Sequence, residues 1–178
     1  MKKLCITIKD WPIAEAEFNR VGLEVEPFQA IVEDNRPLAF NKSVYACMQL
    51  ATFPIDLGSG VFKQGYEDLL LFEDDVKFDG PINFDFPKDA LTVHLGGNII
   101  GMDTTEWKMP TNSTPAGFAR LHNSWQTHAI WYSAEAVEYI LKRFIYVTDE
   151  YKTEGCQIFD EWLRVNVFPM GRSYISNP

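Results

Sequence analysis

Short apolar runs along the chain predict buried strands. Residues 4–8 (LCITI) form one such run, and residues 68–72 (DLLLF) form the strongest one. The second run leads directly into Glu73, Asp74 and Asp75. A continuous apolar run of this kind is typical of a strand covered on both faces, as in a parallel sheet. We therefore predict that residues 68–72 form an inner strand.

Helical stripes alternate with these runs. Ala14, Phe18 and Val21 follow Pro12 at helical spacing, and Gly22 ends the pattern. In the first half of the chain we also expect a strand over 23–32 bent at Pro27, a turn over 33–37, a helix over 38–51 and a loop over 58–65. In the second half we expect strands over 91–95 and 129–132, irregular chain over 101–127, a helix after Ser133 and a last helix or helix-strand piece over 158–167. This order predicts a single α/β domain over residues 1–178, with a mostly parallel central sheet.

The acidic triplet is the main candidate for chemistry. Alternation along a strand sends Glu73 and Asp75 to one side and Asp74 to the other. In open α/β sheets the ligand binds beyond the carboxyl ends of the strands, which is where the triplet lies. Two carboxylates on one side can bind Mg²⁺ or Mn²⁺, and such an ion assists a departing phosphate. A solvated strand end is the alternative, and the triplet alone fits a nuclease or a phosphatase equally well.

Composition narrows the class of partner. The 178 residues carry a net charge of −9, which argues against nucleic acid but not against a nucleotide whose phosphates a divalent cation neutralises. No apolar run approaches the roughly 18–20 residues of a membrane span, and the first residues lack the apolar stretch of a secretory signal. We expect a cytoplasmic protein whose three cysteines, Cys5, Cys47 and Cys156, are reduced.

Three segments together resemble a known family. LLLFEDDVKF resembles the hydrophobic strand and E-D-D of the family 25 glycosyltransferases, the lipopolysaccharide-type sugar transferases whose relatives modify collagen. THAIWYSAEAVEYIL resembles that family's H-A-Y-x-x-S-x-x-G/A-A-x-x-L segment, and IFDEWL resembles its late D-x-x-L. The segments occur in the family's order over residues 68–163. The chain departs from the family at its start, where only Ile8-Lys9-Asp10 and Arg20 remain of an N-L-x-x-R-x-x-R signature.

The resemblance implies a glycosyltransferase A-type fold, a Rossmann-like three-layer sandwich. It implies a nucleotide-diphosphate sugar as donor, a glycan or other hydroxyl as acceptor, Mn²⁺ or Mg²⁺ as cofactor, and inversion at the anomeric carbon. Glu73 and Asp75 then bind the metal, and a late His or Asp can be the third ligand. His128 and Asp160 are the candidates, although a satisfied core histidine is the alternative interpretation of His128.

The nucleotide is expected at the ends of the first two strands and the start of the second helix. Asp34 can bind a base or ribose there, and a plain turn acid is its alternative. Lys42 can reach a phosphate with Asn41 beside it, and a solvated lysine is the alternative. The full set expected at the nucleotide is Ile8, Asp10, Asp34, Asn41, Lys42 and Asp74.

The catalytic base must come from outside the triplet, because Glu73 and Asp75 are assigned to the metal on the phosphate side. Asp160 matches the late D-x-x-L and is the expected base, with Glu161 competing and an exposed helix acid as the alternative. Two further functions stay open. One is a catalytically degenerate member that binds a nucleotide or a glycan, and the other is a metal-dependent phosphohydrolase.

Overall fold

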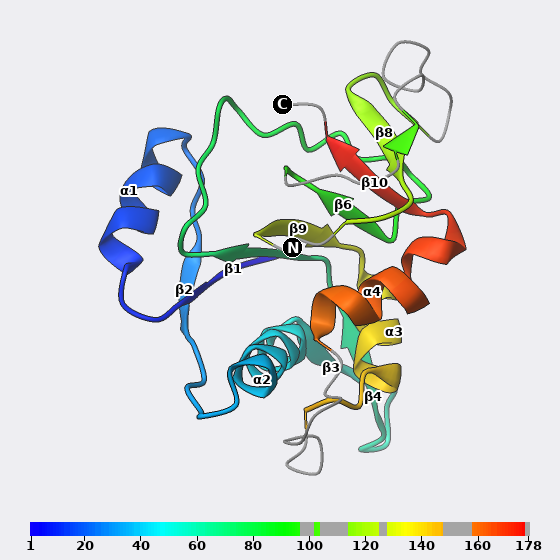
Figure 1. Ribbon diagram of the computed structural model, residues 1–178. Helices are drawn as coiled ribbons and strands as arrows, with labels where there is room; N and C mark the ends of the chain where they lie inside the picture. Colours follow the sequence, from blue (N-terminus) through cyan, green and yellow to red (C-terminus); the bar gives the residue numbers. More distant parts are fainter. Residues whose placement is uncertain (97–101, 104–113, 125–127, 148–157, 177–178) are drawn as a thin grey trace.

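The computed structural model describes residues 1–96, 102–103, 114–124, 128–147 and 158–176 (Figure 1). Within these residues an eight-stranded sheet forms the body, and a separate two-stranded hairpin extends from it. The elements are β1 (Lys2–Thr7), α1 (Trp11–Arg20), β2 (Glu26–Gln29), α2 (Arg36–Leu50), β3 (Thr52–Asp56), β4 (Phe62–Tyr66), β5 (Leu69–Glu73), β6 (Thr92–His94), β7 (Met102–Asp103), β8 (Phe118–Leu121), β9 (Ala129–Tyr132), α3 (Ala134–Arg143), α4 (Phe159–Asn166), the 3-10 helix η3 (Phe168–Met170) and β10 (Ser173–Ser176).

The main sheet is mixed but mostly parallel in direction. Its order is β2-β1-β5-β9-β6-β10-β8-β7. Strand β1 pairs in parallel with β2 and β5, and β6 pairs in parallel with β10, whereas the other four neighbouring pairs are antiparallel. Six of the eight strands therefore share one direction, and β9 and β8 oppose it.

Strand β5 is an inner strand, as its apolar run predicts. It lies between β1 and β9, and Leu69, Leu70, Leu71 and Phe72 are all buried. Leu69 and Leu71 belong to one hydrophobic core, while Leu70 and Phe72 belong to a second core on the opposite face. The run is continuous because both faces of the strand are covered.

Helices cover the two faces unequally. Residues from α2, α3 and α4 pack into the first core, and α1 packs into the second together with apolar side chains from the segment 76–90. Helix α3 begins where the Ser133 hydroxyl accepts a hydrogen bond from Ala136 N at 3.1 Å, as expected of a cap. Helix α2 begins two residues before its predicted start, because the Asn35 side chain caps it and Pro37 fits the first turn.

The segment after the acidic triplet is tied to α1. Glu17 Oε1 accepts from Phe78 N at 2.7 Å, and Arg20 donates both to Glu17 and to the Phe78 carbonyl oxygen. The Phe78 ring packs against Phe18 and Phe72, with centroids 5.9 and 5.8 Å apart. This contact fixes the position of the chain that leaves β5.

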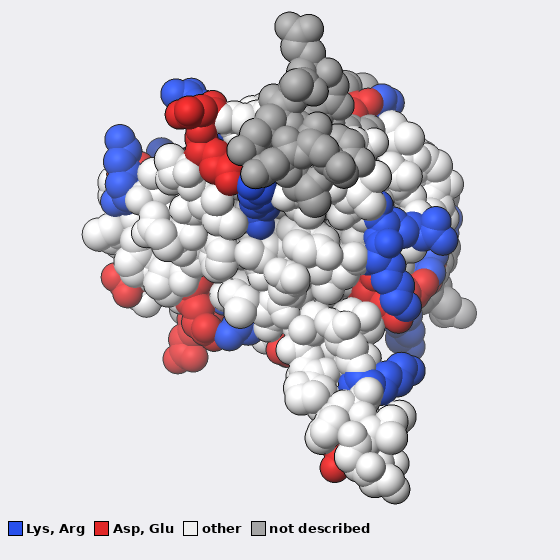
Figure 2. Space-filling model, turned by 90° about the horizontal axis from the view of Figure 1, so that it is seen from below, with Lys and Arg blue, Asp and Glu red and all other residues white. Residues whose placement is uncertain are grey.

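Five of the described strands, β3, β4, β7, β8 and β10, were not predicted. The predicted loop 58–65 lies within the hairpin of β3 and β4, which projects from the body as the mostly uncharged arm in Figure 2. Strand β8 lies in the stretch predicted to be irregular, and β10 pairs with it and with β6. The predicted strand 23–32 is reduced to the edge strand β2, which is where a proline such as Pro27 is tolerated.

Two further expectations concern the thiols and the membrane. Cys5 and Cys47 are buried free thiols, and Cys156 lies outside the described residues. Among the described helices, none has the length and apolar character needed to cross a bilayer.

Candidate metal centre and adjoining cleft

The acidic triplet stands at the carboxyl end of β5, directly opposite the start of β9. Glu73 N donates to the His128 carbonyl oxygen at 2.9 Å, which extends the β5–β9 ladder by one residue. The antiparallel pairing therefore brings His128 beside the triplet, although 53 to 55 residues separate them in sequence. Sequence order alone gives no sign of this proximity.

Glu73, Asp75 and His128 form a compact set of ligand atoms. Each offers one atom, and the three atoms lie within 4.8 Å of one another. His128 Nδ1 lies 3.2 Å from Asp75 Oδ1 and 3.7 Å from Glu73 Oε1. Two carboxylate oxygens and one imidazole nitrogen at this spacing can bind a divalent cation.

The surroundings of His128 Nδ1 indicate whether these three ligand atoms suit a metal ion. His128 Nδ1 is buried and makes no hydrogen bond within the described part of the chain, although two carboxylate oxygens face it. A buried polar atom normally has a partner. A cation between the nitrogen and the oxygens would satisfy all three groups, so the donor set fits one.

Asp74 lies outside this set of ligand atoms, and its carboxylate is bound to the end of β1. Thr7 Oγ1 and Ile8 N both donate to Asp74 Oδ2 at 3.0 Å. The middle residue of the triplet is thereby fixed to the end of β1. The concentrated negative charge also acts on β1, where burial first, and then Asp74, Glu73 and Asp75, raise the pKa of Cys5 to about 12.

A cleft of about 560 Å³ opens beside Glu73 and Asp74. Its walls come from the ends of β1 and β2 and from the start of α2, which is the region expected to hold a nucleotide. Its lining includes the expected residues Ile8 and Asp10, together with apolar Ile31 and Phe40. The volume lies within the range of about 300–1,000 Å³ that is usual for small-molecule sites.

A smaller hollow of about 250 Å³ adjoins the other side of the triad. Asp75 and His128 line it together with Phe78 and Leu95. Glu73 lines the large cleft and Asp75 lines the small one, so the triad stands between the two.

Three other residues expected at the nucleotide lie outside the lining of the large cleft. Asn41 is fully buried, where its Nδ2 donates to Tyr146 O and its Oδ1 accepts from Phe159 N. Lys42 Nζ lies 2.6 Å from Glu33 Oε1, a carboxylate of the cleft wall. Asp34 is exposed in the turn before α2. The geometry gives Asn41 a structural role, and ligand roles for Lys42 and Asp34 stay predictions.

The two expected catalytic acids lie in the first turn of α4. Glu161 receives two hydrogen bonds from Arg164, and these lower its pKa. The pKa of the Tyr132 phenol is raised well above its ordinary value. Burial is the largest cause, the charge of Asp160 is the second and the charge of Glu73 is the third. Asp160 and Glu73 therefore act on the same buried tyrosine.

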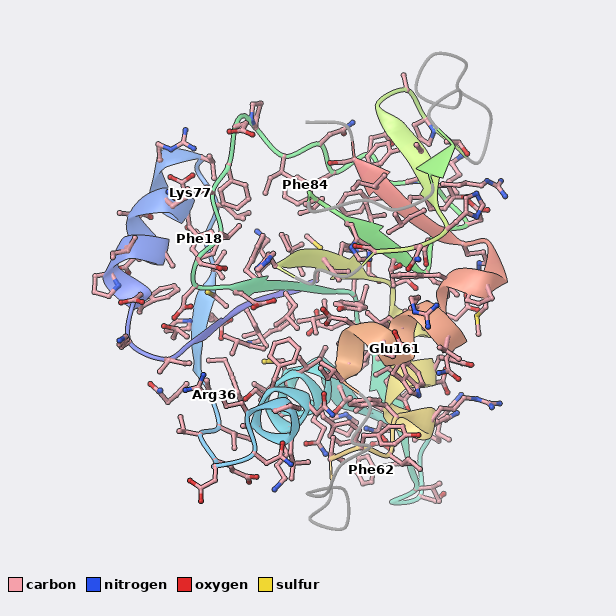
Figure 3. The ribbon with its side chains drawn as sticks, in the orientation of Figure 1. Phe18, Arg36, Phe62, Lys77, Phe84 and Glu161 are labelled. Carbon is pink, nitrogen blue, oxygen red and sulfur yellow. The ribbon has the colours of Figure 1, made fainter. Side chains whose placement is uncertain are left out.

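Sequence patterns did not single out two cations of the cleft. Lys9 and Arg36 both line it, and Arg36 stands at the start of α2 near the end of β2 (Figure 3). Their place in a loop and in a first helical turn gives no periodic signal. A positive residue after each of the first two strands is the one sign that could have indicated them.

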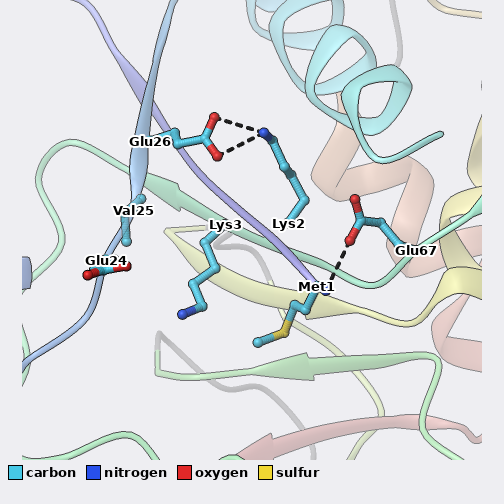
Figure 4. Close-up of a pocket in the computed structure, with 7 residues that line it drawn as sticks. All are labelled: Met1, Lys2, Lys3, Glu24, Val25, Glu26 and Glu67. Atoms are coloured by element: carbon cyan, nitrogen blue, oxygen red, sulfur yellow. Dashed lines mark hydrogen bonds and ion pairs between the residues drawn. The ribbon is translucent and has the colours of Figure 1, made fainter. Parts of the chain in front are cut away.

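A further hollow lies at the opposite, amino-terminal edge of the sheet (Figure 4). Ion pairs join its walls, namely Lys2 Nζ to Glu26 at 2.8 Å and the Met1 amino group to Glu67 at 3.0 Å. Four of the residues that line this hollow therefore pair with one another.

No family model and no curated protein matches the chain. One similar solved structure is that of a glycosyltransferase involved in the glycosylation of the major capsid of PBCV-1. It is 13% identical, with a TM-score of 0.48 over 99% of this chain and 82% of that chain. The similarity is too low to assign a family or an activity, so the resemblance to family 25 stays a prediction.

Proposed function

We propose that this chain is a metal-dependent glycosyltransferase that moves a sugar from a nucleotide diphosphate to an acceptor hydroxyl. One observation carries the proposal: Glu73, Asp75 and His128 gather three ligand atoms beside a nucleotide-sized cleft that Glu73 lines. Such a site meets the demands of a reaction whose leaving group is a diphosphate, because charge develops on that group as it departs.

The donor set favours Mn²⁺ over Mg²⁺. Mg²⁺ prefers oxygen ligands alone, whereas imidazole suits later first-row ions, and Mn²⁺ lies between the two. A divalent ion held by Glu73, Asp75 and His128 would supply charge neutralisation at the leaving phosphate.

The large cleft is the proposed nucleotide site. Ile31 and Phe40 offer apolar surface for a base, and Asp74 and Asp10 offer carboxylates for sugar hydroxyls. Arg36 can bind phosphate oxygens in a bidentate way, since its guanidinium lines the same cleft. The cation and the metal ligands then hold the diphosphate from two sides.

Asp160 is the proposed base for inversion. Buried Phe159 and Trp162 anchor the helix that carries it, and this anchoring would orient the carboxylate. In the proposed step Asp160 takes the proton of the acceptor hydroxyl, the oxygen bonds to the anomeric carbon, and the bond to the diphosphate breaks as the nucleotide leaves with the electron pair. The family resemblance directs the acceptor toward a glycan of the lipopolysaccharide type.

Donor turnover tests the proposal. The protein is incubated with a panel of nucleotide sugars, with and without Mn²⁺, and release of nucleotide is followed. We expect metal-dependent release from one donor, its loss in Asp75→Asn and its retention in Asp79→Asn, a nearby exposed acid outside the triad.

Other results would point elsewhere. Metal-dependent nucleotide binding without turnover of any donor would identify a degenerate member. Release of phosphate from simple esters would identify a phosphohydrolase. No binding of metal or nucleotide would contradict the proposal as a whole.

A further inference from the structure

The hairpin of β3 and β4 gathers exposed apolar side chains far from the metal centre. Leu57, Val61 and Phe62 at its end are 60%, 56% and 64% exposed. Phe53 and Ile55 on β3 are also exposed, at 45% and 38%. Single exposed apolar residues are common on proteins, whereas a contiguous group usually marks an interaction surface.

The shape of the hairpin limits what can cover this surface. The hairpin projects beyond the body as a narrow arm (Figure 2), and β4 contacts α3 only near the body. Phe53 and Ile55 lie over Gly65, where a Cβ atom would meet the Phe53 ring at 2.6 Å, so one face of the arm is flat and apolar. A convex arm fits a deformable or concave partner better than a flat protein surface.

The end of the arm pairs part of its own backbone. Leu57 N donates to Val61 O at 2.9 Å, Val61 N donates to Gly58 O at 3.0 Å, and Gly58 N donates to Asp56 Oδ1 at 2.8 Å. Gly58, Ser59 and Gly60 adopt positive φ angles, which permit this tight turn. Backbone groups need internal partners before a segment can leave water for lipid, and the turn supplies such partners for the N–H groups of Leu57, Gly58 and Val61.

The charged side chains are also unevenly distributed along the arm. Residues 57–62 carry no charged side chain, and Lys63 follows immediately. Lys142 and Arg143 end α3, the helix that β4 contacts. Lys63 therefore borders the uncharged end on one side and Asp56 on the other, and the cations that end α3, of which Lys142 pairs with Glu138, lie beside the base of the arm. This order matches a bilayer, in which anionic headgroups surround the apolar interior.

We propose that the β3–β4 hairpin is a membrane-docking arm that inserts Leu57, Val61 and Phe62 into the surface of an anionic bilayer. Strand addition from a second copy is disfavoured at the outer edge of β3, because Pro54 has no N–H to donate there. Three side chains that enter the bilayer part of the way would give weak, reversible membrane binding, comparable to that of one acyl chain.

The orientation that follows keeps the metal centre accessible. Strand β4 leads into the amino-terminal end of β5, and Glu73 stands at the other end of that strand. Docking through the arm would place the cleft on the side of the sheet turned away from the lipid.

Vesicle flotation tests the inference. Full-length protein is mixed with vesicles of phosphatidylcholine alone or of phosphatidylcholine with phosphatidylglycerol. We expect flotation with the anionic vesicles and a loss of roughly tenfold or more in partitioning for Leu57→Ser/Phe62→Ser. The matched control Ile13→Ser/Val165→Ser removes two exposed apolar side chains elsewhere, 69% and 50% exposed, and should float like the unmodified protein.

Three results would overturn the inference. One is no flotation with either vesicle, and another is an equal loss in the control variant. The third is that the unmodified protein does not bind vesicles but forms a dimer in sedimentation velocity, and that the hairpin variant does not form this dimer. That result would assign the arm to a second copy. If Lys63→Glu keeps the turn intact and loses binding only to the anionic vesicles, the result would support the proposed orientation of the cations.

Discussion

Glu73, Asp74 and Asp75 are consecutive, yet their carboxylates have different partners. Glu73 faces the large cleft, Asp74 is fixed by Thr7 and Ile8, and Asp75 faces the small hollow with His128. Strand alternation predicts that the middle residue differs from the other two. What it cannot predict is the partner of each carboxylate, because the partners come from β1 and from the residue before β9.

The histidine gives the sharpest test at this scale. His128→Asn should weaken Mn²⁺ binding by at least the roughly 10–100-fold that loss of a supporting residue typically causes, because it removes a ligand itself. Calorimetric titration with Mn²⁺ measures the change. His122→Asn, at an exposed histidine, is the control and should bind normally. Equal affinity in both variants would mean that His128 serves only as an ionic partner of the carboxylates.

Buried Asn41 shows where residue patterns mislead. Its position at the start of a helix near the cleft suggests a ligand role, but burial directs its amide to Tyr146 and Phe159 instead. Asn41→Ala should reduce the free energy of unfolding by about 2–4 kcal/mol, because two buried backbone groups lose their partners. Chemical denaturation measures this change.

Asn19→Ala, at an exposed residue of α1, is the control for Asn41 and should change stability by less than about 0.5 kcal/mol. A variant of Asn41 that keeps its stability and loses nucleotide binding would restore the ligand role.

At the scale of elements, the link between α1 and the segment after β5 depends on pH. Hydrogen bonds from Arg20, and then from Phe78 N, lower the pKa of Glu17 from 4.5 to about 2. Because the folded-state pKa is lowered, the stabilisation is fully present above the unfolded value and is lost as the pH falls from about 4.5 toward 2.

Glu17→Gln should therefore melt slightly lower than the unmodified protein at pH 7, and the difference should shrink at pH 3. The decrease is small because the pair is exposed to solvent. Thermal denaturation followed by circular dichroism at the two pH values measures it, with Glu15→Gln on the same helix as the control. A constant difference at both pH values would assign the effect to packing rather than to charge.

The sequence predicts best those elements whose burial is complete. The run at 68–72 identifies an inner strand, and the stripe of Ala14 and Phe18 identifies α1. The hairpin is missed because Pro54, Gly58 and Gly60 are typical of loops and because its apolar side chains face solvent rather than a core. The direction of β9 is also hidden, since a four-residue apolar strand has the same pattern whether it pairs in parallel or antiparallel.

At the scale of the whole molecule, the two ends of β5 have opposite characters. The carboxyl end holds the candidate metal triad, the cleft and its cations, and the amino end leads from the apolar arm. The charge of −9 includes the acids that converge at the carboxyl end, where repulsion among them is reduced only when cations bind. Metal and phosphate binding should therefore depend on each other.

Thermal melting with Mn²⁺ and a nucleoside diphosphate measures that dependence. Mn²⁺ alone and uridine or guanosine diphosphate alone should raise the melting temperature little, and the two together should raise it by more than the sum. At one hundred times the dissociation constant, ligand binding adds about 2.7 kcal/mol of stability.

Arg36→Ala should reduce the joint effect and leave the effect of Mn²⁺ alone unchanged, because Arg36 lines the cleft but does not belong to the triad. Lys88→Ala, at an exposed lysine outside the cleft, should retain the full joint effect. A purely additive response, or a joint effect that survives in Asp75→Asn, would mean that the metal and the nucleotide do not share one site.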